Sequence, residues 1–233
     1  MPSTVVHAAL AFVLAAALLG KYYDRKTLAV VLVIVVLPEL DTIFGWWMSG
    51  AHRAVGHNMV FPAVAAVLLY YDTRLREESW LRERFENWGV GPEWGVRVAW
   101  VGLYVHVFAH VLLDYAHLDG INVLWPLWDR FFSLDGELYL STADGLVQTF
   151  VEIAEDPETG ETAVDVGETG TTEDVHVASP VDAAEDIQDE PDEPVDRRFP
   201  IAVHGWQLYV IVLGAFTLAA KKLQGEPPEE SRK

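Results

Sequence analysis

A group of side chains that can bind a metal ion lies in an apolar stretch near the middle of the chain. His106, His110, Asp114 and His117 are separated by four, four and three residues. Steps of three and four keep side chains on one face of an α-helix. Neutral imidazole and ionised carboxylate both suit Zn²⁺. A buried His–Asp pair joining two helices would have the same spacing, so both interpretations stay open.

A second cluster, His52-Arg53-x3-His57, precedes another apolar run. The guanidinium of Arg53 is a planar fork of donors that fits a phosphate or a carboxylate. The alternative is that Arg53 only anchors a helix end at the membrane surface. Histidines in a surface loop would carry no function by themselves, so the cluster gains meaning from its neighbours in space.

Two carboxylates, Glu39 and Asp41, follow Pro38, and a single histidine, His7, lies near the N-terminus. Proline ends a helix because it lacks an amide hydrogen and clashes with the preceding turn. Asp41 would then either cap the next helix or serve as a ligand. A lone histidine such as His7 is more often an interface residue than a ligand.

Five apolar runs must position these residues, and 51% of the chain is hydrophobic. A helix that spans a bilayer needs about 20 mostly apolar residues. The last run meets this length, and the others reach it by including the histidines and carboxylates above. We therefore expect an all-α, polytopic membrane bundle of about five transmembrane helices. The runs are Val5–Leu19, Leu28–Leu37 (continuing to Met48), Met59–Tyr71, Val98–Leu113 and Ile201–Ala220.

The net charge of −19 comes from one segment, since 17 of the 35 acidic residues lie in 151–196, which has no lysine or arginine. The remainder is nearly neutral, which excludes a basic surface for nucleic acid. We expect a membrane-embedded, hydrolase-like part over residues 1–150, an acidic and largely disordered outer loop over 151–198, and a last transmembrane helix with a cytoplasmic tail over 199–233. Cysteine is absent, which excludes thiol chemistry.

The basic residues predict the orientation. They gather in the loop 20–27, in the loop 72–97 and after Ala220, three segments on one side of a five-helix serpentine. Because short cytoplasmic loops are rich in lysine and arginine, this places the C-terminus in the cytoplasm and the N-terminus outside. His7, Asp41, the His52–His57 cluster and the His110–Asp114 pair then all lie at the outer face of the cell membrane. That coincidence favours one shared metal site.

The order of these motifs resembles the YdjM-type family of inner-membrane, LexA-regulated metal-dependent hydrolases. The resemblance covers about residues 1–135 and rests on His7, Pro38-Glu39-Leu40-Asp41, His52-Arg53-Ala54-Val55-Gly56-His57-Asn58, and His110-x3-Asp114 running to Gly120 and Trp125-Pro126. A more distant similarity links the series to the all-helical zinc-dependent phospholipase C group. The chain departs from the family pattern at Glu39, Ala54, Gly56, Asn58 and His117. These differences weaken the case for hydroxyl-mediated substrate contacts more than the case for metal binding.

The resemblance implies a hydrolase with one or two divalent ions, Zn²⁺ being the best candidate. His7, Asp41, His57, His110 and Asp114 are the expected ligands, with His52 as a further one. Glu39 is the expected general base or orienting group, and Arg53 the partner of an anionic substrate group. A site at the outer interface suggests a lipid or lipid-linked phosphoester as substrate.

Two other functions fit parts of the sequence. A metal or proton carrier, or a stress-response scaffold, would also bury histidines and carboxylates, and His106 lies one helical turn from His110. The acidic segment could bind cations or a basic partner. Its simpler explanation is adaptation to a salty, halophilic environment, because acidic loops with few lysines stay solvated there. Activity that survives deletion of 152–197 would support that explanation.

Overall fold

The computed structural model describes residues 3–48, 50–117, 120–143, 145–155, 162–175 and 201–223. The chain divides into two compact units. We call Pro2–Glu39, Met59–Leu112 and Phe199–Lys233 the helical unit, and Leu40–Asn58 with Leu113–Arg198 the loop unit.

Each of the five apolar runs contains a helix, and capping residues explain several of the boundaries. The side chain of Asp24 accepts a hydrogen bond from the Thr27 amide at the start of the second helix. Pro92 occupies the first turn of the helix that ends at His106. The second helix ends two residues before Pro38, as expected for a residue that cannot continue it. The five helices are α1 (Thr4–Leu18), α2 (Arg25–Val36), α3 (Val60–Tyr70), α5 (Pro92–His106) and α7 (Gly205–Leu223).

Shorter helical pieces extend or join these five helices. A 3₁₀ turn, η1 (Gly20–Tyr22), precedes α2, and a 3₁₀ helix, η2 (Leu37–Trp46), follows it. The π-helix η3 (Tyr71–Leu75) extends α3, and α4 (Trp80–Asn87) precedes α5. The π-helix η4 (Val107–Val111) and α6 (Leu112–Tyr115) continue α5.

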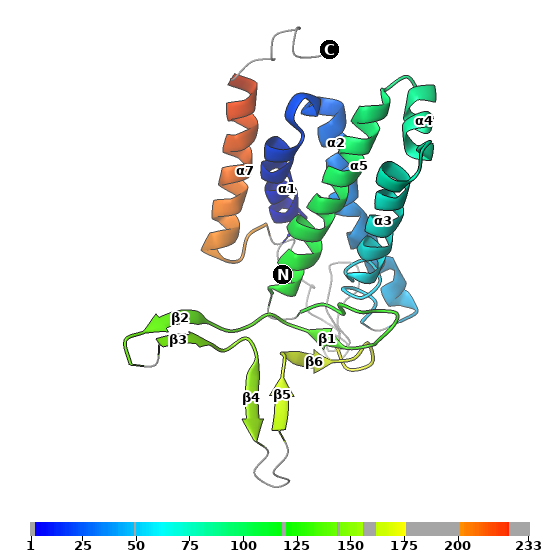
Figure 1. Cartoon of the computed structure of the whole chain (residues 1–233). Helices are drawn as coiled ribbons and strands as arrows, with labels where there is room; N and C mark the ends of the chain where they lie inside the picture. Colours follow the sequence, from blue (N-terminus) through cyan, green and yellow to red (C-terminus); the bar gives the residue numbers. More distant parts are fainter. Residues whose placement is uncertain are drawn as a thin grey trace, which may run out of the picture. The chain divides into compact units, whose positions relative to one another are not determined.

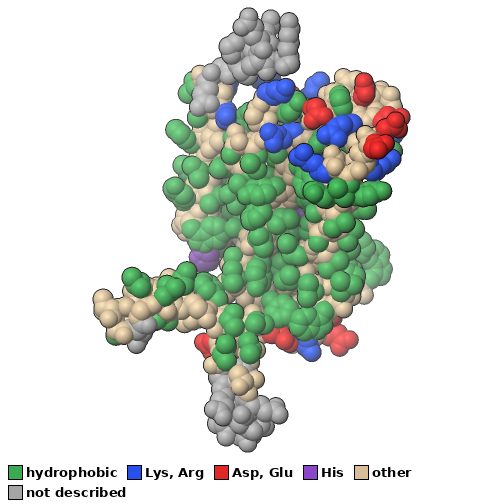
Figure 2. All heavy atoms as spheres, in the orientation of Figure 1, with side chains coloured by type: hydrophobic (Ala, Val, Ile, Leu, Met, Phe, Trp, Pro, Cys, Tyr) green, Lys and Arg blue, Asp and Glu red, His purple; other side chains and the backbone are tan. Residues whose placement is uncertain are grey.

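Within the described residues, three stretches are long and apolar enough to cross a membrane: Arg25–Gly45, Pro92–Tyr115 and Gly205–Leu223. Helix α1 is apolar but shorter, so five membrane-spanning helices are not confirmed. Hydrophobic side chains cover the middle of the helices, whereas lysine and arginine side chains gather at the end where α4 lies (Figure 2). This distribution is typical of helices that meet lipid along their length and water at their ends.

Helix α1 packs against α2, α5 and α7 within the helical unit (Figure 1). Small residues let the helices approach closely: a Cβ on Gly214 of α7 would lie only 2.8 Å from the Cα of Ala9 on α1. Close contact through small residues is a common way to associate helices in lipid. A buried core of alanine, valine and leucine side chains from α1, α2, α5 and η4 continues this packing.

The loop unit contains short antiparallel strands, so the chain is mostly helical rather than all-α. They pair as β1 (Phe131–Phe132) with β6 (Glu168–Gly170), β2 (Leu138–Ser141) with β3 (Gly145–Gln148), and β4 (Glu152–Glu155) with β5 (Thr162–Asp165). Phe131 is fully buried, and the backbone of Ile121 pairs with that of Phe132.

Part of the acidic segment therefore has regular structure, which the sequence analysis did not predict. Strands β4, β5 and β6 all lie within 151–198. The predicted disorder of residues 156–161 and 176–198 concerns positions outside the described residues.

Candidate metal centre

Asp41 is the hub of a buried cluster in the loop unit. Its carboxylate oxygens lie 2.8 Å from Nδ1 of His52 and 2.7 Å from Nδ1 of His57. They also accept the backbone amide hydrogens of Arg53 and Gly56 at 3.2 and 3.0 Å. All three of Asp41, His52 and His57 are buried, and their ligand atoms lie within 4.8 Å of one another.

The protonation of both imidazoles follows from this geometry. An ionised carboxylate only accepts hydrogen bonds, so Nδ1 of His52 and Nδ1 of His57 each carry a hydrogen and donate it to Asp41. The Nε2 atom is then the ring atom left for a metal. Histidines that bind metals characteristically donate their other ring N–H to a carboxylate in this way.

The Nε2 atoms of the two histidines have different surroundings. Nε2 of His57 lies 3.3 Å from Oδ2 of Asp114, which is fully buried. Two ligands about 2.1 Å from one tetrahedral Zn²⁺ would be separated by about 3.4 Å, so this distance fits a shared ion. Nε2 of His52 is buried and has no hydrogen-bond partner among the described residues. The donor set thus fits a divalent cation.

The electrostatics of His57 favour a positive charge at this place. Burial disfavours the charged imidazole, but hydrogen bonds to Asp114 and Asp41 and the charges of both carboxylates outweigh it and raise the pKa of His57 to about 10. Without a metal, the structure supports an imidazolium between two carboxylates, which is the structural His–Asp pair considered above. A metal would replace the Nε2 proton.

A second group of potential ligands lies in the helical unit. His7 is fully buried, donates its Nδ1 hydrogen to the carbonyl oxygen of Ala109 at 2.8 Å, and stacks on His110 with ring centroids 4.3 Å apart. Nε2 of His7 lies 4.0 Å from Oε1 of Glu39. Because a carbonyl oxygen can only accept, Nδ1 of His7 carries the hydrogen. His7, Glu39 and His110 together could hold a cation.

Irregular helices present both groups. Glu39 and Asp41 lie on η2, a 3₁₀ helix, and His110 lies on η4, a π-helix. Long 3₁₀ stretches and π-helical turns are uncommon and occur often at functional sites. Their departure from α-geometry places side chains where a regular helix could not.

Arg53 is fully buried and joins two loops of the loop unit. One guanidinium nitrogen donates to the carbonyl oxygen of Gly120 at 3.0 Å, and the Arg53 carbonyl accepts the amide hydrogen of Asn122 at 2.9 Å. Its φ of 69° is in the left-handed region, which is uncommon for a residue with a side chain. The surrounding hydrogen bonds therefore hold a locally strained backbone.

Three residues that support this region were missed by sequence reasoning. Asp129 accepts hydrogen bonds from the side chains of Asn122 and Thr172, both at 2.6 Å, and from the amide of Thr172. Asn122 lies in the motif stretch from Gly120 to Pro126, and Asp129 follows that stretch. This position is the only sequence signal for these two residues. Thr172 lies in the acidic segment, where no motif marks it.

Other candidates are less central. His106 is half-buried and its ring stands 6.3 Å from that of His110. His117 is half-buried, His204 is exposed, and Asp119 lies outside the described residues.

Comparison with known proteins gives one positive result. The family described as YdjM inner membrane protein matches residues 1–164. A search of curated proteins found no match, and neither did a search of solved structures. The match covers more than half of the 233 residues and includes every residue of both ligand groups. This chain belongs to the YdjM inner membrane protein family.

Proposed function

We propose that the protein is a membrane-bound, metal-dependent hydrolase that acts on lipid or lipid-linked phosphoesters. The observation that carries the proposal is the pair of imidazoles held at Nδ1 by one buried carboxylate, with Nε2 of His57 at a ligand-like distance from Asp114. Purely structural pairs do not need this double orientation. A divalent cation would supply a Lewis acid and lower the pKa of its water toward about 7.

The chain's own residues have distinct parts in this proposal. His57 and Asp114 would bind a cation in the loop unit, where Nε2 and Oδ2 lie 3.3 Å apart, with His52 proposed as a further ligand. His7 and His110, which form a group with Glu39, would bind a cation in the helical unit. Asp41, predicted as a ligand, is proposed to orient His52 and His57 from behind, since both of its oxygens already accept their Nδ1 hydrogens.

Glu39 and Arg53 are proposed to act on the substrate and the water. Glu39 is close to His7 and keeps a partly exposed carboxylate, as a group that accepts a proton should. Arg53 carries a fully buried guanidinium, a planar fork of donors whose geometry matches a phosphate group. A phosphoester is therefore the proposed substrate class.

The decisive experiment measures metal content and hydrolysis together. The wild type, purified in detergent and loaded with Zn²⁺, should contain one or two ions per chain by elemental analysis and should hydrolyse a soluble phosphoester. Asp114→Asn should lose at least one ion, because the amide cannot replace a charged ligand. Glu137→Gln, in an exposed position of the loop unit, is the matched control. A metal-free wild type, or an unchanged number of ions per chain in Asp114→Asn, would contradict the proposal.

One observation favours the alternative function of a metal or proton carrier. His7, His110 and His106 form a series of neighbouring rings in the helical unit, with centroid distances of 4.3 and 6.3 Å. Such a series could pass a proton along α5. Proteoliposomes that move H⁺ or Zn²⁺ while phosphoesters stay intact would establish the carrier instead.

A further inference from the structure

An apolar groove lies between α3 and α5 within the helical unit. Its volume is about 260 Å³, near the small end of ligand pockets. Not one of its lining residues is charged: Met59, Pro62, Ala63, Ala66, Trp100, Leu103, Tyr104, Val107 and Phe108. This volume and lining suit part of a hydrocarbon chain rather than a polar molecule.

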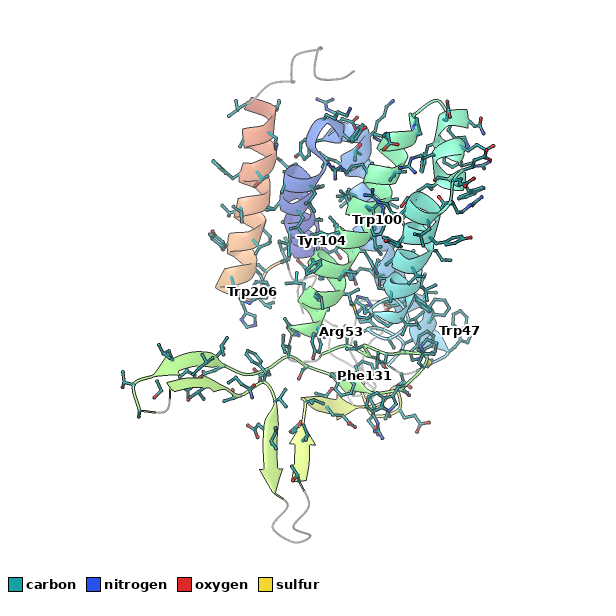
Figure 3. All side chains as sticks on the ribbon, in the orientation of Figure 1. Trp47, Arg53, Trp100, Tyr104, Phe131 and Trp206 are labelled. Carbon is teal, nitrogen blue, oxygen red and sulfur yellow. The ribbon has the colours of Figure 1, made fainter. Side chains whose placement is uncertain are left out.

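Aromatic side chains form one wall of the groove. Trp100 and Tyr104 both arise from α5 (Figure 3). The rings of Tyr104 and Phe108 stack with centroids 4.4 Å apart, and both side chains are exposed. The Trp100 indole donates its N–H to Thr73 Oγ1 at 3.2 Å, which fixes the ring at the groove. The wall is therefore ordered before any ligand arrives.

The membrane location identifies the occupant. Helix α5 belongs to the candidate span Pro92–Tyr115 of an inner membrane protein. The material around an exposed apolar groove on such a helix is the acyl chains of lipids. A water-soluble ligand would need polar groups in the lining to fix its orientation.

The groove and one of the two ligand groups share the π-helix η4. The π-helix η4 contributes Val107 and Phe108 to the groove. The next two residues of the same turn belong to the buried histidine group, since Ala109 contacts His7 and His110 stacks on it. A lipid chain in the groove would thus contact the same helical turn that carries a potential metal ligand, His110.

We propose that the α3–α5 groove binds an acyl chain of a membrane phospholipid and so selects lipid over soluble phosphoesters. The substrate part of this inference rests on the proposed hydrolase function. The binding part does not, because it depends only on the groove and its surroundings.

The test fills the groove and compares it with a matched change outside it. Ala66→Phe places a ring in the groove, whereas Val67→Phe adds the same ring to the next position, which is 68% exposed and does not line the groove. Each protein is placed in vesicles of phosphatidylethanolamine and phosphatidylglycerol that contain a phosphatidylglycerol with a diazirine on one acyl chain. After illumination, labelled peptides are mapped and the yield is measured.

Wild type and Val67→Phe should be labelled on α3 and on residues 100–108, and Ala66→Phe should lose about tenfold in yield, as expected when roughly two buried methylene groups lose their contacts. Equal labelling of Ala66→Phe, or labels spread evenly over all helices, would overturn the binding site.

In a hydrolysis assay, Ala66→Phe should lower kcat/KM for the phospholipid and leave kcat/KM for a soluble phosphoester unchanged. Equal loss on both substrates would overturn selection of lipid. Labelled but inactive wild type would refute the hydrolase and leave the acyl-chain site standing.

Discussion

Asp41 shows what a single buried carboxylate can do when its two oxygens serve two imidazoles. Asp41→Asn keeps the shape but has one acceptor oxygen and an amide that donates, so at least one Nδ1 loses its acceptor. We expect Zn²⁺ affinity to fall by about 10–100-fold, the usual effect of removing such an orienting partner. Isothermal titration with Zn²⁺ measures it.

The same experiment separates an orienting role from a ligand role. If Asp41 only orients, Asp41→Asn should regain the wild-type number of ions at high Zn²⁺, whereas Asp114→Asn should not. Asp129→Asn is a useful control, since that partly buried carboxylate also accepts several hydrogen bonds but none from either histidine. A permanent loss of one ion in Asp41→Asn would make it a ligand and contradict our assignment.

The residues that gather in the two buried groups were predictable from the sequence, but their contacts were not. Helical spacing and the motif order pointed to His7, Asp41, His57, His110 and Asp114. No periodicity indicates that Asp41 faces the Nδ1 atoms of both His52 and His57. That contact depends on the turn at residues 51–57, where Arg53 adopts a left-handed backbone. Local strain of this kind is maintained by tertiary contacts, which sequence patterns do not contain.

At the scale of secondary-structure elements, long apolar runs predicted the helices correctly, whereas short segments gave no usable signal. Every run of ten or more apolar residues became a helix. The short strands β1 to β6 were missed because they are only two to four residues long, and segments such as Leu138–Ser141 lack an alternating pattern. Helix α4 was missed because it lies in a charged loop, and a short capped turn sets its start.

That turn makes the α3–α4 connection sensitive to acid. Burial opposes ionisation of Asp72, but hydrogen bonds from Ser79, Leu81 and Trp80 and the charge of Arg76 outweigh it and hold its pKa below the usual value. A carboxyl group whose pKa is lower in the folded than in the unfolded state stabilises the fold. This stabilisation is complete above the unfolded-state pKa and is lost as the pH falls through the folded-state pKa. We expect amide exchange in α4 to accelerate below about pH 4.

The Asp72→Asn variant tests the cause. It should exchange quickly already at pH 7, with a loss of about 1 kcal/mol typical of a removed cap, and should change little on acidification. Glu77→Gln changes an exposed neighbouring carboxylate and should behave like wild type. Acid sensitivity that persists in Asp72→Asn would place its origin elsewhere.

At the scale of the whole molecule, the basic residues make a prediction about orientation. We propose that the basic loop 72–97, which contains α4, faces the cytoplasm and that the connections 38–58 and 114–200 are outside, with the N-terminus outside and the C-terminus inside. The chain has no cysteine, so single introduced cysteines report cleanly. In intact cells, a membrane-impermeant maleimide should label Ala143→Cys and leave Glu86→Cys unlabelled until the cells are lysed. The reverse pattern would invert the topology.

The described part of the acidic segment contributes to the fold of the loop unit. Residues 162–175 supply β5, β6 and Thr172, and β6 pairs with β1 while Thr172 binds Asp129. Deleting 152–197 as a whole would remove these contacts, so it is too coarse a test of a solvating role. A sharper one replaces 177–196 by a Gly/Ser linker of equal length.

We expect that linker variant to keep the Zn²⁺ content and melting temperature of the wild type in low salt. Replacing 162–175 instead should lower the melting temperature, because the partly buried Asp129 would lose its Thr172 donors, at a cost of about 1–3 kcal/mol. If the acidic residues keep the protein solvated in salt, the linker variant should aggregate as KCl is raised to molar concentrations, whereas the wild type should not. The metal content of the linker variant at low salt should stay normal. Loss of Zn²⁺ in the linker variant would instead tie the distal acidic residues to the metal centre, and the charge would then belong to the function rather than to the surroundings.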